Sequence, residues 1–298
     1  MHMKPQHTLL ALLVVAIWGV NFTVISIGLG SFPPLLLAAL RFAIAALPAI
    51  FLPRPNISWP RLIAISATLF LGQFGFLFTG MAIGAPAGLA SVVLQSQAFI
   101  TILIASLILR ERPTGRQIGG TIVAFTGLAM IAATAGGKGF TMLGLALCLA
   151  AALCWAVGNV LLRGAGKPDM LPLIVWLSVI PPLPLLGLSL LLEGPQTISH
   201  ALLTLHWSGS MAVLYNAILS TIVGYGIWGH LLKHYPAATV VPFSLLVPIV
   251  GVAAAALILN ETFNPTRMGG MSLVLIGLFV VIFPFQRMAA TFLRRWVR

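Results

Sequence analysis

Apolar runs of about twenty residues recur along the whole chain, separated by short clusters of Pro, Gly and charged residues. A run of this length lets an α-helix cross the ~30 Å hydrocarbon core of a bilayer at ~1.5 Å per residue. The pattern therefore predicts an all-α membrane protein with ten transmembrane helices. Their expected boundaries are 8–28, 34–52, 61–82, 86–109, 117–134, 141–162, 171–192, 209–232, 236–259 and 268–286.

Part of this pattern is duplicated. The stretch "LILRERPTGRQIGG" (107–120) returns 150 positions later as "LILNETFNPTRMGG" (257–270), with six of fourteen residues identical. The offset contains five predicted helices, an odd number, so the two copies face opposite sides of the membrane. We therefore expect two inverted five-helix repeats, 8–134 and 141–286, followed by a basic tail, 287–298. Inverted repeats are typical of alternating-access transporters.

The turns that end in Pro86 and Pro236 are very tight, and each makes two predicted helices antiparallel neighbours. The long loop "EGPQTISHALLTLHWS" (193–208) is either irregular or a surface helix. The first apolar run is too long for a secretory signal and has no clean cleavage site, so it is expected to stay as the first span.

The composition agrees with a membrane protein, since 60% of the residues are hydrophobic and only 7% are charged. A soluble domain has about a quarter charged residues. The net charge of +12 does not indicate a nucleic-acid partner, because the basic residues lie in short loops and form no continuous patch. Cys148 and Cys154 lie about 120° apart on one predicted helix, cannot pair with each other, and are expected to be packing residues.

The basic residues are distributed unequally between the two sides. If the N-terminus defines side one, side two holds only Lys138 and Arg267, and Arg41 lies inside the second span. By the positive-inside rule, both termini are cytoplasmic. Side one holds the other thirteen: Lys4, Arg54, Arg61, Arg110, Arg112, Arg116, Arg163, Lys167, Lys233, Arg287, Arg294, Arg295 and Arg298.

Polar side chains within spans are costly in a bilayer unless they meet a partner or line a wet cavity. Such residues, and aromatic residues, cluster on spans one, three, four, six and eight, which correspond between the two halves. The expected substrate-binding residues are Trp18, Asn21, Gln73, Phe74, Phe78, Gln95, Trp155, Asn159, Tyr225 and Trp228. Helix-interrupting residues in the same spans indicate hinges. These are Gly72, Gly75, Gly224, Gly226, Pro242 and Pro248.

Several of these residues have a second interpretation. Trp18 and Trp155 either hold a substrate ammonium by cation–π attraction, of order ~1–2 kcal/mol, or pack in the core. Asn21 and Asn159 are either substrate donors or interhelical hydrogen-bond partners. Phe74 and Phe78 share a helix face, as packing residues also do. Gln95 and Gln97 point in different directions, so at most one faces a cavity.

Arg41 is the one cation well inside a span, roughly 10 Å from its external end. It either extends to the outer surface or meets a substrate carboxylate or a helix C-terminus. Glu111 and Glu261 end their helices beside arginines and are expected to anchor turns.

The motifs "LLVVAIWGVNF", "PPLLLAALRFAIAALPAIF" and "APAGLASVVLQSQAFITILIASLILRERPTGRQIGG" identify a resemblance, as do "LAAALCWAVGNV", "STIVGYGIWGHLL" and "FSLLVPIVGVAAAALILNE". Residues 8–286 resemble the ten-helix EamA branch of the drug/metabolite transporter superfamily. Within it they are most similar to bacterial amino-acid exporters, of the aromatic or the cysteine and O-acetylserine type. The resemblance implies export of amino acids across the bacterial inner membrane.

The residues favour a transporter over an enzyme, since no span carries a catalytic spacing or a carboxylate pair. No Walker-type loop is present, so neither ATP nor an ATPase subunit is expected, and no cofactor or metal is expected either. The absence of a mid-span Asp or Glu favours facilitated efflux. The chain is expected to be a monomer or weak dimer. The alternatives are proton coupling, for which His230 and His234 are candidates, export of nucleosides, drugs or other small metabolites, and a channel or scaffold.

Overall fold

The computed structural model describes residues 3–108, 110–136, 139–166 and 168–283, and this part of the chain is helical throughout its regular structure. The basic tail, Lys138 and Lys167 lie outside the described residues. The first half contains α1 (Pro5–Leu29), α2 (Pro34–Ala46), α3 (Trp59–Ser66), α4 (Gln73–Ala82), α5 (Ala87–Val93), α6 (Gln97–Ile108) and α7 (Gly115–Ala132). The second half contains α8 (Met142–Arg163), α9 (Met170–Ser178), α10 (Pro182–Leu192), α11 (Pro195–Leu203), α12 (Trp207–Leu214), α13 (Gly224–His234), α14 (Ala237–Val240), α15 (Leu246–Leu259) and α16 (Pro265–Ile282).

Several predicted spans consist of consecutive helices that continue into one another. Counting each single helix or continuous series of helices as one unit, eight units among the described residues are long and apolar enough to cross a membrane. A shorter apolar unit covers Pro34–Ile50. The unit predicted at 117–134 is α7, which begins with the polar residues Arg116 and Gln117 and is not among the eight. The loop at 193–208 contains the surface helix α11.

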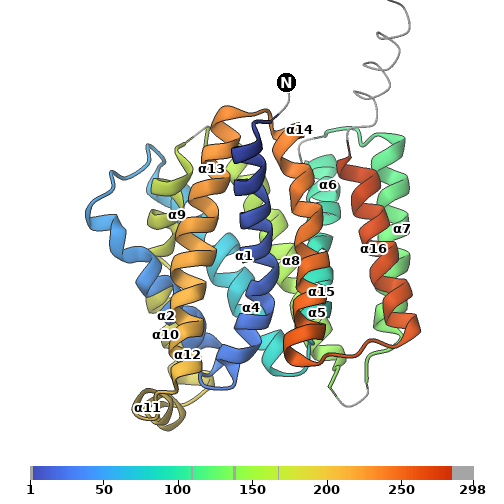
Figure 1. Ribbon diagram of the computed structural model, residues 1–298. Helices are drawn as coiled ribbons and strands as arrows, with labels where there is room; N and C mark the ends of the chain where they lie inside the picture. Colours follow the sequence, from blue (N-terminus) through green and yellow to red (C-terminus); the bar gives the residue numbers. More distant parts are fainter. Residues whose placement is uncertain (1–2, 109, 137–138, 167, 284–298) are drawn as a thin grey trace, which may run out of the picture.

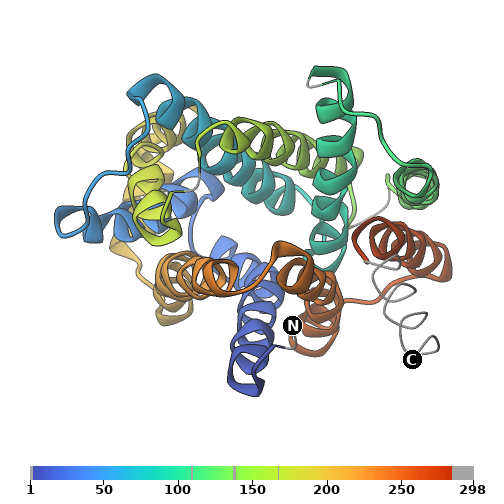
Figure 2. The same ribbon diagram turned by 90° about the horizontal axis from the view of Figure 1, so that it is seen from above.

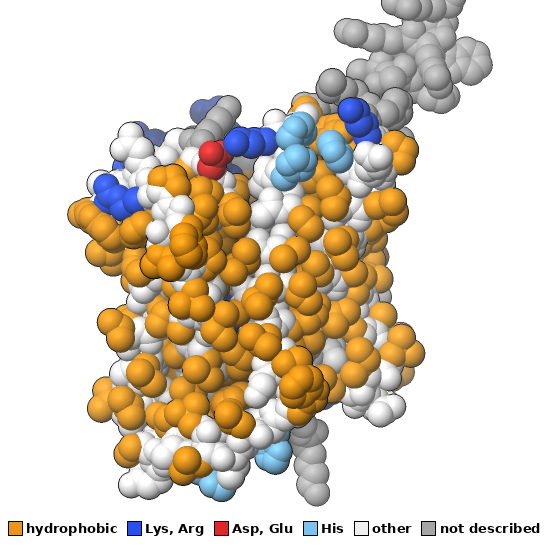
Figure 3. Space-filling view, turned by 60° about the vertical axis from the view of Figure 1, so that its left-hand side comes forward, with side chains coloured by type: hydrophobic (Ala, Val, Ile, Leu, Met, Phe, Trp, Pro, Cys, Tyr) orange, Lys and Arg blue, Asp and Glu red, His pale blue; other side chains and the backbone are white. Residues whose placement is uncertain are grey.

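The bundle has one basic end and an apolar wall (Figures 1 and 3). Lys and Arg side chains gather at the end where the N-terminus lies, hereafter the basic end, whereas α11 lies at the opposite end. The wall exposes many large hydrophobic side chains, among them Leu107, Leu191 and Leu257 at about four-fifths exposure. An exposed apolar wall of this extent is what contact with lipid requires.

The duplicated stretch has the same backbone conformation in both copies. Arg110 and Asn260 are left-handed, at φ 55° and 54°, and among the described residues they are the non-glycine residues with positive φ. In each copy the backbone N–H of the next residue donates a hydrogen bond to the carbonyl oxygen six residues earlier. Glu111 donates to Ala105 at 3.4 Å, and Glu261 donates to Ala255 at 3.2 Å. A left-handed residue is a common way for a helix to end, and here it is accompanied in both copies by the same wide hydrogen bond.

The next helix also starts in the same way in both copies. Thr114 accepts a hydrogen bond from the Gln117 backbone N–H, and Asn264 accepts one from the Arg267 backbone N–H. Each side chain satisfies one of the amides that a helix N-terminus leaves unpaired. The helix end, turn and helix start are therefore duplicated in geometry as well as in sequence.

Four spans are interrupted at matching places. A π-helical segment covers Ala67–Gly72 between α3 and α4, and another covers Tyr215–Val223 between α12 and α13. A 3₁₀ segment covers Leu94–Ser96 between α5 and α6, and another covers Val241–Leu245 between α14 and α15. π-Bulges occur often at functional sites, and they change which side chains face a neighbour.

Helices α7 and α16 form a separate pair at one edge of the bundle (Figure 2). Their backbones touch at glycines. A Cβ on Gly127 would lie 2.5 Å from the Gly270 carbonyl oxygen, and a Cβ on Gly277 would lie 2.4 Å from the Gly120 carbonyl oxygen. Small residues at such contacts let membrane helices approach closely.

Candidate functional site

Arg41 lies in α2 and is buried in the bundle, with 1% of its surface exposed. Its guanidinium donates to the hydroxyl of Thr221 at 3.1 Å, to Oδ1 of Asn216 at 3.1 Å and to the hydroxyl of Ser220 at 3.5 Å. All three partners belong to the π-helical segment 215–223. A first-half cation is thus bound by one segment of the second half.

The charge of Arg41 has no anionic partner among the described residues, whose ion pairs are Arg163–Glu111 and Lys233–Asp169. Its guanidinium carbon lies 4.0 Å from the centre of the Phe74 ring, a cation–π contact that supplies only part of the lost hydration. The burial excludes extension of Arg41 to the outer surface. A buried cation with only neutral partners is unusual and is expected at functional sites.

The π-helical geometry explains how three polar side chains reach one guanidinium. The Thr221 hydroxyl donates to the carbonyl oxygen of Asn216, five residues back, and Asn216 itself donates to Ala212. The wider turn brings the side chains of Asn216, Ser220 and Thr221 to the same face. None of the three is among the binding residues expected from the sequence, because their convergence depends on the π turn.

An aromatic cluster adjoins this network. The ring of Trp18 in α1 lies 5.1 Å from that of Tyr225 and 5.3 Å from that of Trp228, both in α13, measured between centroids. Trp18 also donates from Nε1 to the Ser220 carbonyl oxygen at 3.0 Å. Because Ser220 contacts both Arg41 and Trp18, the cation and the aromatic cluster form one candidate site, made by residues of both halves.

Two polar groups of α1 are buried and unpaired. Asn21 is 6% exposed and Thr23 is fully buried, and neither the Oδ1 of Asn21 nor the hydroxyl of Thr23 has a hydrogen-bond partner in the described chain. An unpaired buried acceptor is destabilising unless a ligand or water satisfies it. Asn21 lies one helical turn from Trp18, which places an available acceptor near the aromatic cluster.

The other expected binding residues are spread more widely. Asn159 in α8 donates to Oε1 of Gln97 at 2.9 Å, so Gln97 makes the cross-helix contact and Gln95 does not. Trp155 is half-buried and, within the described chain, has no aromatic-ring contact with Trp18 or with another residue. Phe78 is fully buried beside Phe74, and Gln73 is 3% exposed.

The expected hinge residues differ in how closely they are packed. Gly72 ends one π segment, where an added Cβ would lie 2.9 Å from Sγ of Cys154. Gly75 and Gly226 have ordinary van der Waals room. The prolines lie on one span, Pro242 in its 3₁₀ segment and Pro248 in α15, where its carbonyl oxygen accepts a hydrogen bond from Ser91 at 3.4 Å.

We expect Gly224→Ala to impair the site more than Gly226→Ala. A Cβ at Gly224 would lie 2.6 Å from Nε1 of Trp18 and would push the indole off the Ser220 carbonyl, whereas at Gly226 the nearest atom is 3.7 Å away. Loss of one buried hydrogen bond and its packing corresponds to about a tenfold lower transport efficiency. Transport by the two purified variants in proteoliposomes measures this, and equal transport would remove Trp18 from the site.

The helical fold, the apolar wall and a polar site joining two halves define a polytopic membrane transporter. The chain belongs to the EamA-like transporter family, whose profile matches it twice, at residues 7–133 and 142–283. It is 44% identical to a "Probable amino-acid metabolite efflux pump" of Salmonella typhimurium, over 95% of this chain and 97% of that protein. A protein of the same description in Escherichia coli is 42% identical, over 94% and 96%.

A solved crystal structure also shares the fold, with a TM-score of 0.61 over 93% of this chain and 96% of that chain, at 18% identity. This likeness shows the fold alone. The family and the two relatives are transporters, so the chain is related to proteins that move solutes and not to enzymes.

Proposed function

We propose that this protein exports amino acids and related small metabolites from the cytoplasm across the bacterial inner membrane. The observation that carries this proposal is Arg41, a buried cation bound by neutral groups and coupled through Ser220 to an aromatic cluster. The description of the two close relatives as amino-acid metabolite efflux pumps supports the same substrate class.

The carboxylate and ammonium groups of an amino acid fit the two parts of this site. Arg41 recognises the carboxylate, because a guanidinium binds carboxylates through two N–H donors and has no competing acid here. The faces of Trp18, Tyr225 and Trp228 attract the ammonium, and Oδ1 of Asn21 accepts a hydrogen bond from it. The aromatic rings also favour apolar or aromatic side chains, although cysteine and O-acetylserine remain candidate substrates.

The transport cycle is alternating access between two inverted five-helix repeats with both termini cytoplasmic. Three observations support the duplication: the double family match, the paired left-handed residues and the paired helix interruptions. The α7–α16 contacts support inversion, because Gly120–Gly277 and Gly127–Gly270 exchange when 150 is added to the first residue and subtracted from the second. A two-fold axis relates contacts in this way.

Efflux runs down the gradient of the substrate, in a monomer or weak dimer that needs no ATPase subunit. All four acidic residues of the chain, Glu111, Asp169, Glu193 and Glu261, lie outside the middle of the spans, which leaves no carboxylate for a proton or sodium site there. The alternative is proton coupling through His7, His230 and His234, whose rings cluster at the basic end within 5.8 Å of one another.

Counterflow in proteoliposomes tests the proposal. Unlabelled internal amino acid should accelerate uptake of labelled amino acid, without ATP and with proton and sodium gradients abolished, because a carrier returns faster when loaded. A panel of aromatic, neutral and sulfur-containing amino acids, with O-acetylserine, defines the substrate. Acceleration that disappears when the proton gradient is removed would favour coupling, and no acceleration by any amino acid would reject the function.

We expect Trp18→Ala and Trp155→Ala to reduce counterflow while expression is kept. For Trp18 the loss of the aromatic cluster and of the hydrogen bond to Ser220 corresponds to about a tenfold reduction. Trp155, which makes no ring contact with that cluster in the described chain, is expected to have the smaller effect. Counterflow equal to wild type in both variants would exclude both indoles from substrate binding.

A further inference from the structure

The four carboxylates of the chain all lie near the ends of spans, but they make different contacts. At the basic end, Glu111 and Asp169 form exposed ion pairs with Arg163 and Lys233. At the opposite end, Glu193 and Glu261 accept hydrogen bonds from backbone amides at the start of a helix in the first half. Only the opposite end is therefore held by carboxylate caps.

Glu261 joins the end of α15 to the start of α5. Its two carboxylate oxygens accept the backbone N–H groups of Ala87 at 2.6 Å and Gly88 at 3.0 Å. Pro86, which precedes them, offers no side-chain acceptor, so these amides depend on Glu261. The amide side of the contact is buried, since Ala87 is 2% exposed and a Cβ on Gly88 would lie 2.7 Å from the Phe263 ring.

The corresponding contact at the basic end is not made. Pro236, 150 residues after Pro86, has the same extended backbone, at φ −56° and ψ 140° compared with −58° and 145°. In the described chain no acceptor meets the backbone N–H groups of Ala237 and Ala238, and Ala237 is exposed. Helices α5 and α15 pack together, but α6 and α14, at the other ends of the same spans, make no comparable contact in the described part.

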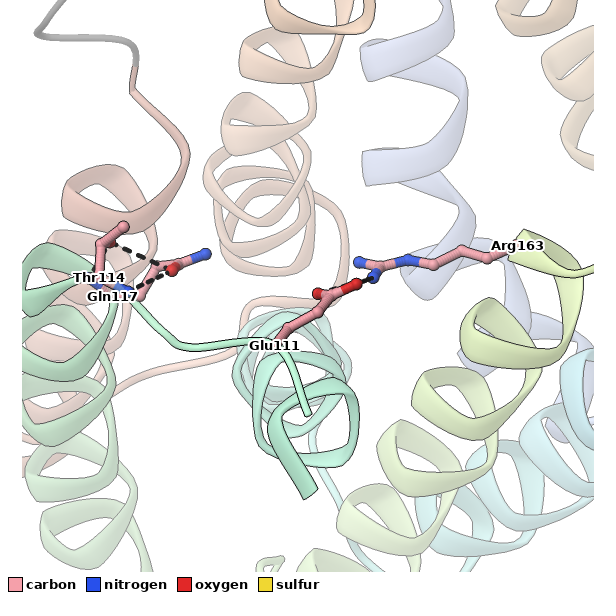
Figure 4. Close-up of polar contacts among 4 residues, drawn as sticks. All are labelled: Glu111, Thr114, Gln117 and Arg163. Carbon is pink, nitrogen blue, oxygen red and sulfur yellow. Dashed lines mark hydrogen bonds and ion pairs between the residues drawn. The ribbon is translucent and has the colours of Figure 1, made fainter. Parts of the chain in front are cut away.

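Glu111, the residue equivalent to Glu261, instead pairs with Arg163 at 3.3 Å (Figure 4). The two side chains are 57% and 51% exposed. An exposed ion pair contributes little stability. A carboxylate that caps a helix N-terminus gains charge-assisted hydrogen bonds and a favourable interaction with the helix dipole. Glu111 therefore loses little if it leaves Arg163 for the amides of Ala237 and Ala238.

We propose that Glu111 and Glu261 act as alternating latches of the transport cycle. By a latch we mean a carboxylate that caps a helix start, and so holds one end of the bundle closed, in only one of the two states. When the opposite end is closed, Glu261 caps Ala87 and Gly88, and Glu111 forms its ion pair with Arg163. When the basic end closes, Glu111 caps Ala237 and Ala238, Glu261 releases its amides, and α5 separates from α15. This proposal rests on the proposed alternating-access function, and the structure then represents the state that is open toward the cytoplasm.

Cysteine accessibility in a background without Cys148 and Cys154 tests the latches. Ser91→Cys reports on the opposite end, because Ser91 of α5 is 1% exposed and faces Gly251 of α15. Thr239→Cys reports on the basic end, where Thr239 is half-buried beside the unmade contact. Labelling uses a small, membrane-impermeant maleimide on right-side-out and on inside-out vesicles.

Glu261→Gln is expected to raise labelling at position 91 about tenfold and to lower labelling at position 239, because the neutral amide loses the charge-assisted part of two hydrogen bonds. Glu111→Gln is expected to raise labelling at position 239, with no rise at position 91. Glu193→Gln is the matched control. Glu193 also caps a helix, at Leu35 and Leu36, but has no acidic equivalent 150 residues earlier, at Ala43.

Unchanged labelling in Glu261→Gln, or an equal rise in Glu193→Gln, would overturn the latch. Counterflow measured on the same vesicles separates this failure from failure of the function. If amino-acid counterflow is present but labelling at positions 91 and 239 does not shift in opposite directions, the latch is rejected and the function stands. Opposite shifts in labelling without amino-acid counterflow support the latch and reject the substrate.

Discussion

Arg41→Gln should lower amino-acid transport by about a hundredfold while leaving thermal stability unchanged or higher. Removing one member of a desolvated charge pair costs roughly 2–5 kcal/mol of binding, which gives the expected loss. Stability should not fall, because the folded protein no longer buries a cation that has no anionic partner among the described residues. Initial rates in proteoliposomes and thermal denaturation in detergent measure the two quantities.

The control is Arg54→Gln, at an exposed arginine over the Trp59 ring, which should change neither quantity. Competition adds a second test of carboxylate recognition. In the wild type an amino acid should compete better than the amine that lacks its carboxylate, and in Arg41→Gln this preference should disappear. A variant that unfolds, or that keeps the preference, would make Arg41 a structural residue.

Gly127→Ala should destabilise the protein by about 1–3 kcal/mol, as overpacking does, and lower the melting temperature by about 5 °C. The added Cβ would lie 2.5 Å from the Gly270 carbonyl oxygen and 2.9 Å from Cβ of Leu273, so α7 and α16 must separate. Gly277→Ala should have a similar effect, because its Cβ meets the Gly120 carbonyl oxygen in the same way. Thermal denaturation followed by gel filtration measures both.

Gly119 provides the matched control in the same helix. It is exposed, and a Cβ there would meet nothing within 4 Å. Gly119→Ala should therefore be neutral or stabilising by up to about 1 kcal/mol, as alanine is the better helix former. Equal melting temperatures for all three variants would mean that the glycine contacts between α7 and α16 do not hold the two helices together.

The hydrophobic pattern predicted the helices well, because the length of an apolar run is set by the thickness of the bilayer. The structure confirms the apolar helices, and the tight turns at Pro86 and Pro236 lie where the pattern placed them. The pattern did not predict that a span such as 209–232 contains a π-helical segment. π Turns have no simple sequence period, and Gly224 alone does not distinguish one from a kink.

The sequence indicated part of the candidate site. Residue types indicated Arg41, Trp18, Asn21 and Tyr225. Polar groups inside a bilayer are costly unless they have a partner or line a cavity, and aromatic residues cluster on the same spans. Partners were harder to predict, because they depend on how helices rotate against one another. The sequence did not predict that Gln97 pairs with Asn159, nor that Ser220 contacts both Arg41 and Trp18.

The left-handed residue at each helix end shows how membrane insertion and folding compete for one position. Asparagine, at position 260, tolerates this conformation far better than arginine, at position 110. On the proposed orientation, Arg110 is one of the charges that keep its loop in the cytosol as the nascent chain is threaded into the bilayer. On that orientation, the first copy keeps a residue that is strained in this conformation because its charge is needed, whereas the second copy, with its loop outside, can use asparagine at the same φ.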